Sequence, residues 1–346
     1  MRFAVAEQDT ALAEAAGEVL DREVDAEVVR AGWPGAGPHG GPGDRVGAVW
    51  RTLAQVGITG TLVPQHADGL GLDERALPPL METLGRSGLP VPAAEVVAVG
   101  APLLAAAGAT SYLAAVLDGT ALLAVGLTEG AAVPFAARAD LVVVRVGRQA
   151  RLYERGEVRV EPLAAVDGSR HLGRVTAPPA GGLVLAGEEA LDVPWRRGVL
   201  ATSGLLVGLA GRMLELTVGY VRERHQFGVP VGSFQAVKHA LADAETAVRF
   251  ARPAVLAAGW AQATGAPDAE LRTSMAKVLA SDAARRVART AIQCHGAIGY
   301  TTEYDLHLYA KRAWALAADW GGPAYHRERM ARRLGLTPAS APAPAP

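Results

Sequence analysis

The stretch that decides the fold is residues 220–235, YVRERHQFGVPVGSFQ, which follows a long apolar segment. That segment is typical of a helix, and the apolar spacing after Ser233 predicts a second, bundle-forming helix. The second helix is indicated by five residues at three- and four-residue steps: Phe234, Val237, Leu241, Ala244 and Val248. A tight corner between the two helices is predicted by three turn-forming residues: Gly228, Pro230 and Gly232.

The same corner carries two side chains that suit an anion. Arg224 comes just before the turn, and Gln235 falls in the first turn of the second helix. Unpaired backbone N–H groups and the positive end of the helix dipole favour an anion there. An arginine fork beside a helix N-terminus fits a diphosphate. From the pattern alone, an ordinary helical corner with a surface arginine is the favoured interpretation.

Two blocks of sequence resemble the acyl-CoA dehydrogenase family. Residues 222–243, RERHQFGVPVGSFQAVKHALAD, and residues 291–313, AIQCHGAIGYTTEYDLHLYAKRA, look like its two C-terminal signatures, in the same order. The likeness extends from about residue 3 to residue 336. The resemblance implies an α+β fold with four parts: an N-terminal helical domain (1–118), a small reduced β domain (119–190), a C-terminal four-helix bundle (191–336) and a disordered Pro/Ala tail (337–346).

This resemblance implies FAD as the cofactor, with the diphosphate bound across a subunit interface. Six positions match the cofactor-binding residues of the two signatures: Arg224, Phe227, Gln235, Gln293, Gly296 and Gly299. One family glycine is replaced by Ala297. Thr128 belongs to an element that resembles the family's Thr-Glu-Pro, which lies against the flavin ring.

The catalytic base of the family is missing from its expected places. In most members a glutamate follows the second signature, where this chain has Gly321 within the sequence DWGGP. In other members the glutamate precedes the first signature, at the position of Gly198 here. We therefore predict no catalytic residue in this chain. Asp319 is the best substitute, but we interpret it as a turn aspartate, because a displaced base would miss the required geometry.

The β domain is also shortened relative to the family. Residues 127–130 look like the Thr-Glu-Pro element, and residues 133–140 resemble a stretch that normally follows tens of residues later. Some family members of actinobacterial type, especially in steroid breakdown, form α2β2 heterotetramers in which one chain is trimmed and lacks the glutamate. The resemblance thus implies a homologous partner subunit or a homo-oligomer, an acyl-CoA substrate, and an electron-transferring flavoprotein as electron acceptor.

Three functional hypotheses remain. The first is an FAD-dependent acyl-CoA dehydrogenase subunit whose homologous partner supplies the base. The second is a self-sufficient homo-oligomer that uses Asp319. The third is a non-catalytic scaffold or acyl-CoA-binding protein, because a shared fold does not guarantee shared chemistry.

Composition excludes several other classes of function. The 346 residues are half apolar and carry a net charge of −1, which argues against disorder and a nucleic-acid partner. The only cysteine, Cys294, permits no intramolecular disulfide, and no signal-peptide pattern is visible, so we expect a cytoplasmic protein. The uncharged run 96–117 is long enough for a membrane span, but its glycines and proline favour two short buried helices. No metal ligands are predicted.

Local patterns give further expectations. An amphipathic helix is predicted over residues 3–29, and Asp73 is predicted to cap a helix that continues to Leu84. Four short β-rich runs bounded by Gly and Pro predict strands within residues 121–130, 139–147, 150–163 and 182–187. Pro253 is expected to kink the second bundle helix or end its first part.

Overall fold

A computed structural model describes residues 7–34 and 44–336 of the chain. The Pro/Ala tail, the start of the first predicted helix and most of the Gly/Pro-rich loop before Asp44 lie outside these residues. The described chain forms two compact units: one contains Val5–Leu80 with Leu89–Ala201, and the other contains Met81–Gly88 with Thr202–Pro346. The finer division into three domains stays a prediction.

The unit that begins the chain combines helices with all the longer strands. Its helices are α1 (Glu7–Glu23), α2 (Ala26–Ala31), α3 (Arg45–Gln55), the π-helix η3 (Ala94–Gly100), α5 (Ala101–Ala106) and α6 (Thr110–Leu117), with short 3₁₀ turns at η1 (Ile58–Gly60) and η2 (Gln65–Ala67). Asp25 and Asp44 cap α2 and α3, because their carboxylates accept the backbone N–H groups of Val28 and Gly47.

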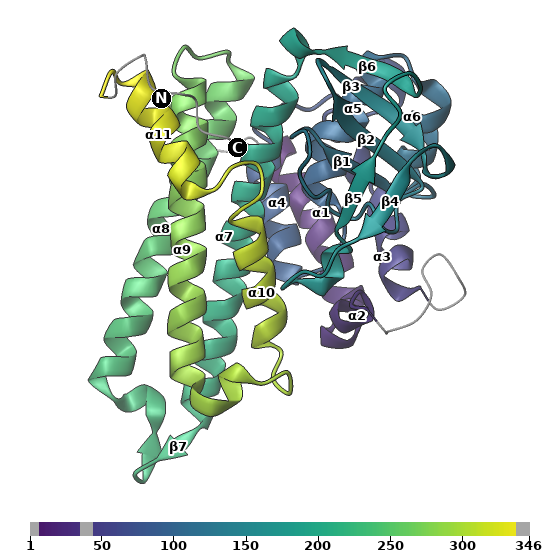
Figure 1. Ribbon diagram of the computed structural model, residues 1–346. Helices are drawn as coiled ribbons and strands as arrows, with labels where there is room; N and C mark the ends of the chain where they lie inside the picture. Colours follow the sequence, from purple (N-terminus) through teal and green to yellow (C-terminus); the bar gives the residue numbers. More distant parts are fainter. Residues whose placement is uncertain (1–6, 35–43, 337–346) are drawn as a thin grey trace. The chain divides into compact units, whose positions relative to one another are not determined.

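The strands of this unit form a mixed sheet and a separate ribbon (Figure 1). The sheet has the order β1 (Leu123–Gly126), β2 (Leu141–Val146), β3 (Gln149–Glu154), β6 (Leu183–Gly187). Strand β1 pairs with β2 in parallel, whereas the other neighbours are antiparallel. The ribbon pairs β4 (Arg159–Pro162) with β5 (Gly173–Thr176), and the short 3₁₀ turns η4 (Arg155–Glu157), η5 (Gly168–Arg170) and η6 (Glu188–Ala190) complete this part.

The sheet is covered on both faces at β1 and β2, whereas the edge strand β6 is mostly exposed. One face packs on η3, where Gly100 brings the helix backbone close to Leu123 and Val125. The other face forms a small core with residues of the β1–β2 connection and of the ribbon: Ala124, Val133, Ala136, Ala139, Val142, Val144, Tyr153 and Val158, flanked by Val160 and Val175. The connection between β1 and β2 is therefore part of the core rather than a surface loop.

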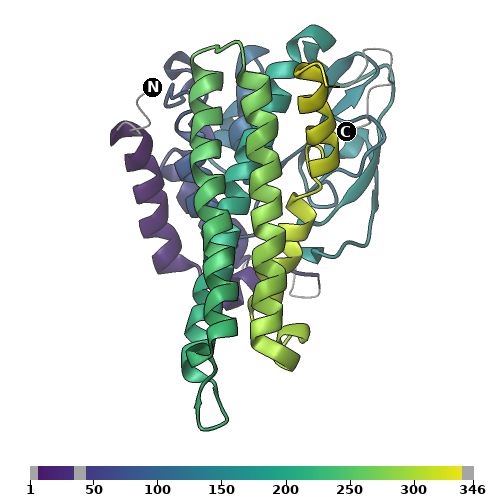
Figure 2. The ribbon, with the colours of Figure 1, turned by 90° about the vertical axis from the view of Figure 1, so that its left-hand side faces the viewer.

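The second unit is a helical bundle (Figures 1 and 2). Its helices are the parts of α4 (Leu77–Ser87) and α7 (Asp192–Glu223) that belong to it, followed by α8 (Gln235–Ala263), α9 (Ala269–His295), α10 (Leu306–Leu316) and α11 (Pro323–Arg333). Figure 2 shows α8 and α9 side by side and antiparallel. Gly85 and Gly208 let α4 and α7 approach closely, because a Cβ on either would meet the other helix's backbone at 2.2 Å or less.

The predicted corner between α7 and α8 is a small β-hairpin. Strands β7 (His225–Gln226) and β8 (Val229–Pro230) pair antiparallel and are joined by Phe227 and Gly228, both with positive φ. This combination is the signature of a two-residue hairpin turn. The 3₁₀ turn η7 (Val231–Ser233) then leads into α8. Of the predicted bundle face, Ala244 and Val248 are buried, whereas Phe234 is 39% exposed.

Three local predictions are corrected by the structure. The first helix is divided at residues 24–25 into α1 and α2. Asp73 does not cap a helix, since its carboxylate binds Arg75 and α4 begins only at Leu77. Pro253 does not end α8, which continues to Ala263, and the alternative of a kink at Pro253 stays a prediction. A proline inside a long helix is accommodated when the neighbouring turns are held by packing, and Ala251, Ala254 and Val255 are buried.

The apolar run 96–117 contributes to η3, α5 and α6 rather than to one long helix. Among the described residues, one helical stretch, Glu188–Glu223, has the length and composition to cross a membrane. In the folded chain, 72% of its most apolar window is buried, as in the core helix of a globular protein.

Candidate functional site

A cavity of about 660 Å³ opens in the bundle unit beside the hairpin. Its walls come from the end of α7 and the hairpin, the first turns of α8, and the end of α9 with the 3₁₀ turn η8 (Gly296–Tyr300). The lining residues are Tyr220, Arg224, Gln226, Val231, Ala236, Val237, Ala240, Gln293, Cys294, His295, Gly296, Ala297 and Ile298. The cavity joins both sequence blocks that were predicted to bind the cofactor.

Arg224 is positioned by the hairpin that follows it. Its backbone N–H donates to Tyr220 O and its carbonyl accepts from Val231 N at 2.8 Å, so both sides of the corner are tied to it. Its guanidinium is exposed and has no hydrogen bond or ion pair among the described residues. Because the backbone of Arg224 is fixed and its guanidinium is unpaired, this side chain can bind an anionic ligand.

The start of α8 offers further donors to the same ligand. The N-cap residue Phe234 gives no side-chain hydrogen bond to the first turn. The first N–H groups of this 29-residue helix are therefore not capped by a side chain, and the helix dipole adds positive potential. Gln235, the first residue of α8, is exposed at this end.

The glycine-rich end of α9 depends on glycine at two positions. Gly296 has φ 64 and ψ −139, a conformation that only glycine adopts easily. Gly299 is buried, and a Cβ there would lie 2.9 Å from Ile292 O and 3.0 Å from the Cβ of His295. Ala297 has no positive φ, so its backbone does not require the glycine found in the family.

An aromatic cluster supports the wall of the cavity. The ring of His295 stacks on Tyr220, with centroids 4.3 Å apart, and lies 4.7 Å from the ring of Tyr304. Its Nδ1 donates to Ala291 O, and burial lowers the pKa of His295, which keeps the imidazole neutral. Burial also raises the pKa of the Cys294 thiol, so this side chain is not a thiolate at neutral pH.

The structure brings together three of the predicted cofactor residues: Arg224, Gln293 and Gly296 all line the cavity. Gln235, Phe227 and Gly299 lie on the same elements but do not line it. Thr128 belongs to the other unit, where it follows β1 and its carbonyl accepts from Ala131 N. The role of these residues toward FAD stays a prediction.

The comparison with known proteins decides the family. The family model described as "Acyl-CoA dehydrogenase, C-terminal domain" matches residues 195–335. Over 273 residues the chain is 33% identical to acyl-CoA dehydrogenase IpdE2 of Mycobacterium tuberculosis, covering 77% of this chain and 80% of that protein. The chain belongs to the acyl-CoA dehydrogenase family.

Solved structures confirm the acyl-CoA dehydrogenase fold. A chain of the ChsE4-ChsE5 complex from Mycobacterium tuberculosis has a TM-score of 0.82 at 24% identity and covers 98% of this chain and 100% of its own. A chain of PigA, solved with FAD and proline, has a TM-score of 0.83 at 20% identity, with coverage of 97% and 100%. The predicted α+β fold class is therefore confirmed.

The family resemblance predicts the catalytic base at the position of Gly321. The structure leaves little room for a side chain there. Gly321 has φ 89 and follows Trp320, whose φ is 54. A Cβ on Gly321 would lie 2.6 Å from Cδ1 of Tyr325 and 3.0 Å from Nε2 of His326. At the next residue, Gly322, a Cβ would meet no heavy atom within 4 Å. A side chain at Gly321 would therefore strain the backbone and displace Tyr325 or His326.

A buried lysine holds this loop in place. Lys277 of α9 is fully buried, and its Nζ donates to the carbonyls of Leu316, Ala317 and Gly321 at 3.1, 3.1 and 3.2 Å. The first two carbonyls belong to the end of α10, where helical carbonyls have no donor four residues on, although Leu316 O also accepts from Asp319 N at 3.2 Å. The ammonium thus joins the end of α10 to the Gly321 loop.

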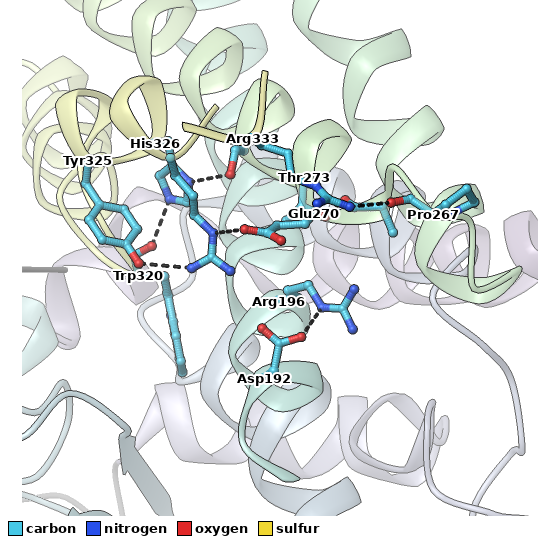
Figure 3. Close-up of polar contacts among 12 residues, drawn as sticks. Asp192, Arg196, Pro267, Glu270, Thr273, Trp320, Tyr325, His326 and Arg333 are labelled. Atoms are coloured by element: carbon cyan, nitrogen blue, oxygen red, sulfur yellow. Dashed lines mark hydrogen bonds and ion pairs between the residues drawn. The ribbon is translucent and has the colours of Figure 1, made fainter. Parts of the chain in front are cut away.

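His326 of α11 also holds this loop, through the carbonyl of Trp320 (Figure 3). Its Nε2 donates to Trp320 O at 3.0 Å, and its Nδ1 accepts from the Ser274 hydroxyl at 3.1 Å. Burial, reinforced by the nearby ammonium of Lys277, lowers the pKa of His326 to about 4. Figure 3 shows the Trp320 indole pointing away from His326. Neither Lys277 nor His326 was predicted from the sequence to take part in this site.

Proposed function

We propose that this chain is a subunit of an FAD-dependent acyl-CoA dehydrogenase whose homologous partner supplies the catalytic base. One observation carries the proposal: the cavity beside Arg224 keeps its anion-binding groups, whereas Gly321 has neither a carboxylate nor room for one. A chain with these two properties can complete a flavin site but cannot itself remove the α-proton of a thioester.

The residues around the cavity fit the FAD diphosphate. The guanidinium of Arg224 matches a phosphate in geometry and charge, and the uncapped start of α8 adds backbone donors. Gln293 and the backbone of Gly296 complete the polar rim, while Ala236 and Ala240 leave an apolar wall. FAD, when bound, would accept the β-hydrogen of the thioester as hydride. The contribution of this chain is to hold the cofactor.

An exposed aromatic side chain supports a partner subunit. Phe227 is 93% exposed and has φ 52, which is unfavourable for a bulky residue. Its ring meets the exposed Phe234 edge to face, with centroids 6.2 Å apart. Exposed apolar residues that also bear strain mark an interaction surface rather than a core. In the family pattern this corner reaches the cofactor of the neighbouring subunit.

The proposed function implies a partner subunit, an electron acceptor and an acyl-CoA substrate. A homologous dehydrogenase chain is the first, and the solved ChsE4-ChsE5 complex gives a precedent for two chains in one assembly. An electron-transferring flavoprotein is the proposed electron acceptor. Because the β domain is shortened, we propose a bulky acyl-CoA, such as one with a steroid-derived acyl group, as the substrate class.

Co-expression tests the proposal directly. The chain is produced alone and together with a homologous chain from the same genome that has the family glutamate. We expect a yellow complex that reduces a dye with acyl-CoA only when both chains are present. Turnover at a normal rate by this chain alone would refute the need for a partner, and Asp319→Asn would then test the remaining candidate base.

A matched pair of arginine variants separates cofactor binding from folding. Arg224→Ala should lose most of the bound flavin, whereas Arg222→Ala, an exposed arginine two residues earlier, should keep it. The single thiol gives an independent readout. Cys294 lines the cavity, so bound FAD should slow its alkylation by a maleimide. A complex that never contains flavin and shows no such protection would instead favour a non-catalytic scaffold.

A further inference from the structure

The β1–β2 connection contains an arginine that nothing in the described chain neutralises. Arg138 is half-buried, and neither a hydrogen bond nor an ion pair joins its side chain to any described residue. The nearest acid in sequence, Asp140, is already engaged, because its carboxylate accepts from Leu122 N at 2.8 Å. Arg138 thus differs from Arg145 and Arg174 of the same region, which pair with Glu188 and Glu161.

The backbone around Arg138 is held rigidly by a second loop. Val133 exchanges two hydrogen bonds with Gly173, and Phe135 N donates to Arg170 O at 2.6 Å. Ala137 N, the donor next to Arg138, bonds to the carbonyl of His171 at 3.2 Å. The position of Arg138 is therefore fixed before any ligand arrives.

This junction of two loops also carries strain. Phe135 has φ 62 and His171 has φ 42, and both are non-glycine residues in the left-handed region. Strained backbone of this kind persists where the surrounding structure enforces it, and it clusters at functional sites. Here the two strained residues, Phe135 and His171, lie on the two loops whose hydrogen bonds fix the backbone at Arg138.

Burial without a partner is unfavourable for a guanidinium. Desolvation lowers the pKa of Arg138 to about 10, and no neighbouring charge opposes this shift. A buried cation is normally paired, so an unpaired one indicates that its counterion is supplied from outside the chain. Among biological ligands, phosphates match the planar donors of arginine best.

We propose that Arg138 binds a phosphate group of a nucleotide ligand, either CoA of the thioester substrate or FAD. The inference rests on the proposed function for the choice of nucleotide. It assigns to the β-strand region a phosphate contact in addition to those of the Arg224 cavity. The guanidinium, already positioned by the two joined loops, would donate to the phosphate oxygens and regain the partners that burial has removed.

A comparison of free and ligated stability tests the assignment. In the full chain, with its partner if one co-purifies, Arg138→Met removes the charge but keeps most of the apolar stem. We expect the ligand-free protein to melt a few degrees higher than the wild type, because an uncompensated charge is gone. We expect affinity for CoA or FAD to fall by about 10- to 100-fold, the loss typical of a charge-assisted contact.

Control variants, and ligands with and without phosphate, show whether Arg138 contacts a phosphate and in which nucleotide. Arg138→Lys should keep part of the affinity, and Arg174→Met, which removes an exposed paired arginine, should leave binding unchanged. Binding of pantetheine and riboflavin, which lack phosphate, should be insensitive to Arg138→Met, whereas CoA or FAD should reveal which nucleotide is involved.

Three results would overturn the inference. The first is a lower melting temperature for ligand-free Arg138→Met, which would make Arg138 structural. The second is unchanged affinity for both nucleotides in that variant, which would leave the proposed function intact. The third is a wild-type protein that binds neither CoA nor FAD, which would remove the proposed function as well.

Discussion

Substitution of Gly321 by alanine should destabilise the chain far more than the same substitution at Gly322. The two glycines are adjacent in one loop, but Gly321 has φ 89 whereas Gly322 has φ −76. An alanine at Gly321 would place its Cβ 2.6 Å from Tyr325 Cδ1. At Gly322 the same atom would have no heavy atom within 4 Å.

The magnitude follows from three contributions. The left-handed conformation costs an L-residue about 1–2 kcal/mol, and forcing a methyl group into a packed site costs about 1–3 kcal/mol. The stiffer unfolded chain of an alanine variant offsets about 0.4–1 kcal/mol. Gly321→Ala should therefore lose about 3 kcal/mol of unfolding free energy. Gly322→Ala should change it by less than about 1 kcal/mol, since Gly322 is only an N-cap without a side-chain bond.

Denaturant unfolding of the two variants measures this difference, and activity measures its consequence. Gly321→Glu restores the residue type of the family base, but we expect it to fold poorly and to give no turnover without the partner chain. Gly322→Glu is the matched control that introduces a carboxylate into the same loop without the clash. Equal stability of Gly321→Ala and wild type would refute the reasoning, as would an active homo-oligomer of Gly321→Glu.

Three further perturbations test the same structural account. Because the folded-state pKa of His326 is about 4 and the unfolded value is 6.5, the unfolded chain binds the proton first. Unfolding free energy should fall by about 3 kcal/mol between pH 6.5 and 4, and His326→Gln should flatten this loss in pH-dependent melting curves. Lys277→Met leaves three buried carbonyls without their ammonium donor, so denaturant unfolding should show a loss of about 2–4 kcal/mol. Phe227→Asn relieves the strain of φ 52, so the isolated chain should melt higher by about 1 kcal/mol of stability, while size-exclusion chromatography should show weaker assembly.

The corner between α7 and α8 was predictable in outline because its glycines and proline are strong local signals. The conformation of Phe227 was not, because phenylalanine is rare at positive φ and only the register of the two-residue hairpin requires it there. Strand β5 was also missed. Its sequence, GRVT, is short and half polar, and it becomes a strand because Val175 pairs with Val160.

In the candidate site too, some residues were predictable from the sequence and others were not. Arg224 and Gln293 were found from the sequence blocks, since their neighbours form a recognisable pattern. Lys277 is one of three lysines in the chain, and no sequence motif marks it as functional. A better signal was its place in the sequence between Ala276 and Val278, which are both buried. A lysine at such a position must find acceptors, and this requirement points to the carbonyls of a neighbouring helix end.

The loss of the base and the retention of its loop have one physical explanation. A loop that had merely lost a catalytic glutamate would be free to vary, yet the Gly321 loop is fixed by a buried ammonium and a buried neutral imidazole. Both groups are costly to bury and are stable only because the loop carbonyls accept their hydrogen bonds. The loop is therefore held in the conformation that leaves little room for a side chain at Gly321. A subunit that must still present a complementary surface to a base-carrying partner would combine these two features, whereas a self-sufficient enzyme would need the position open.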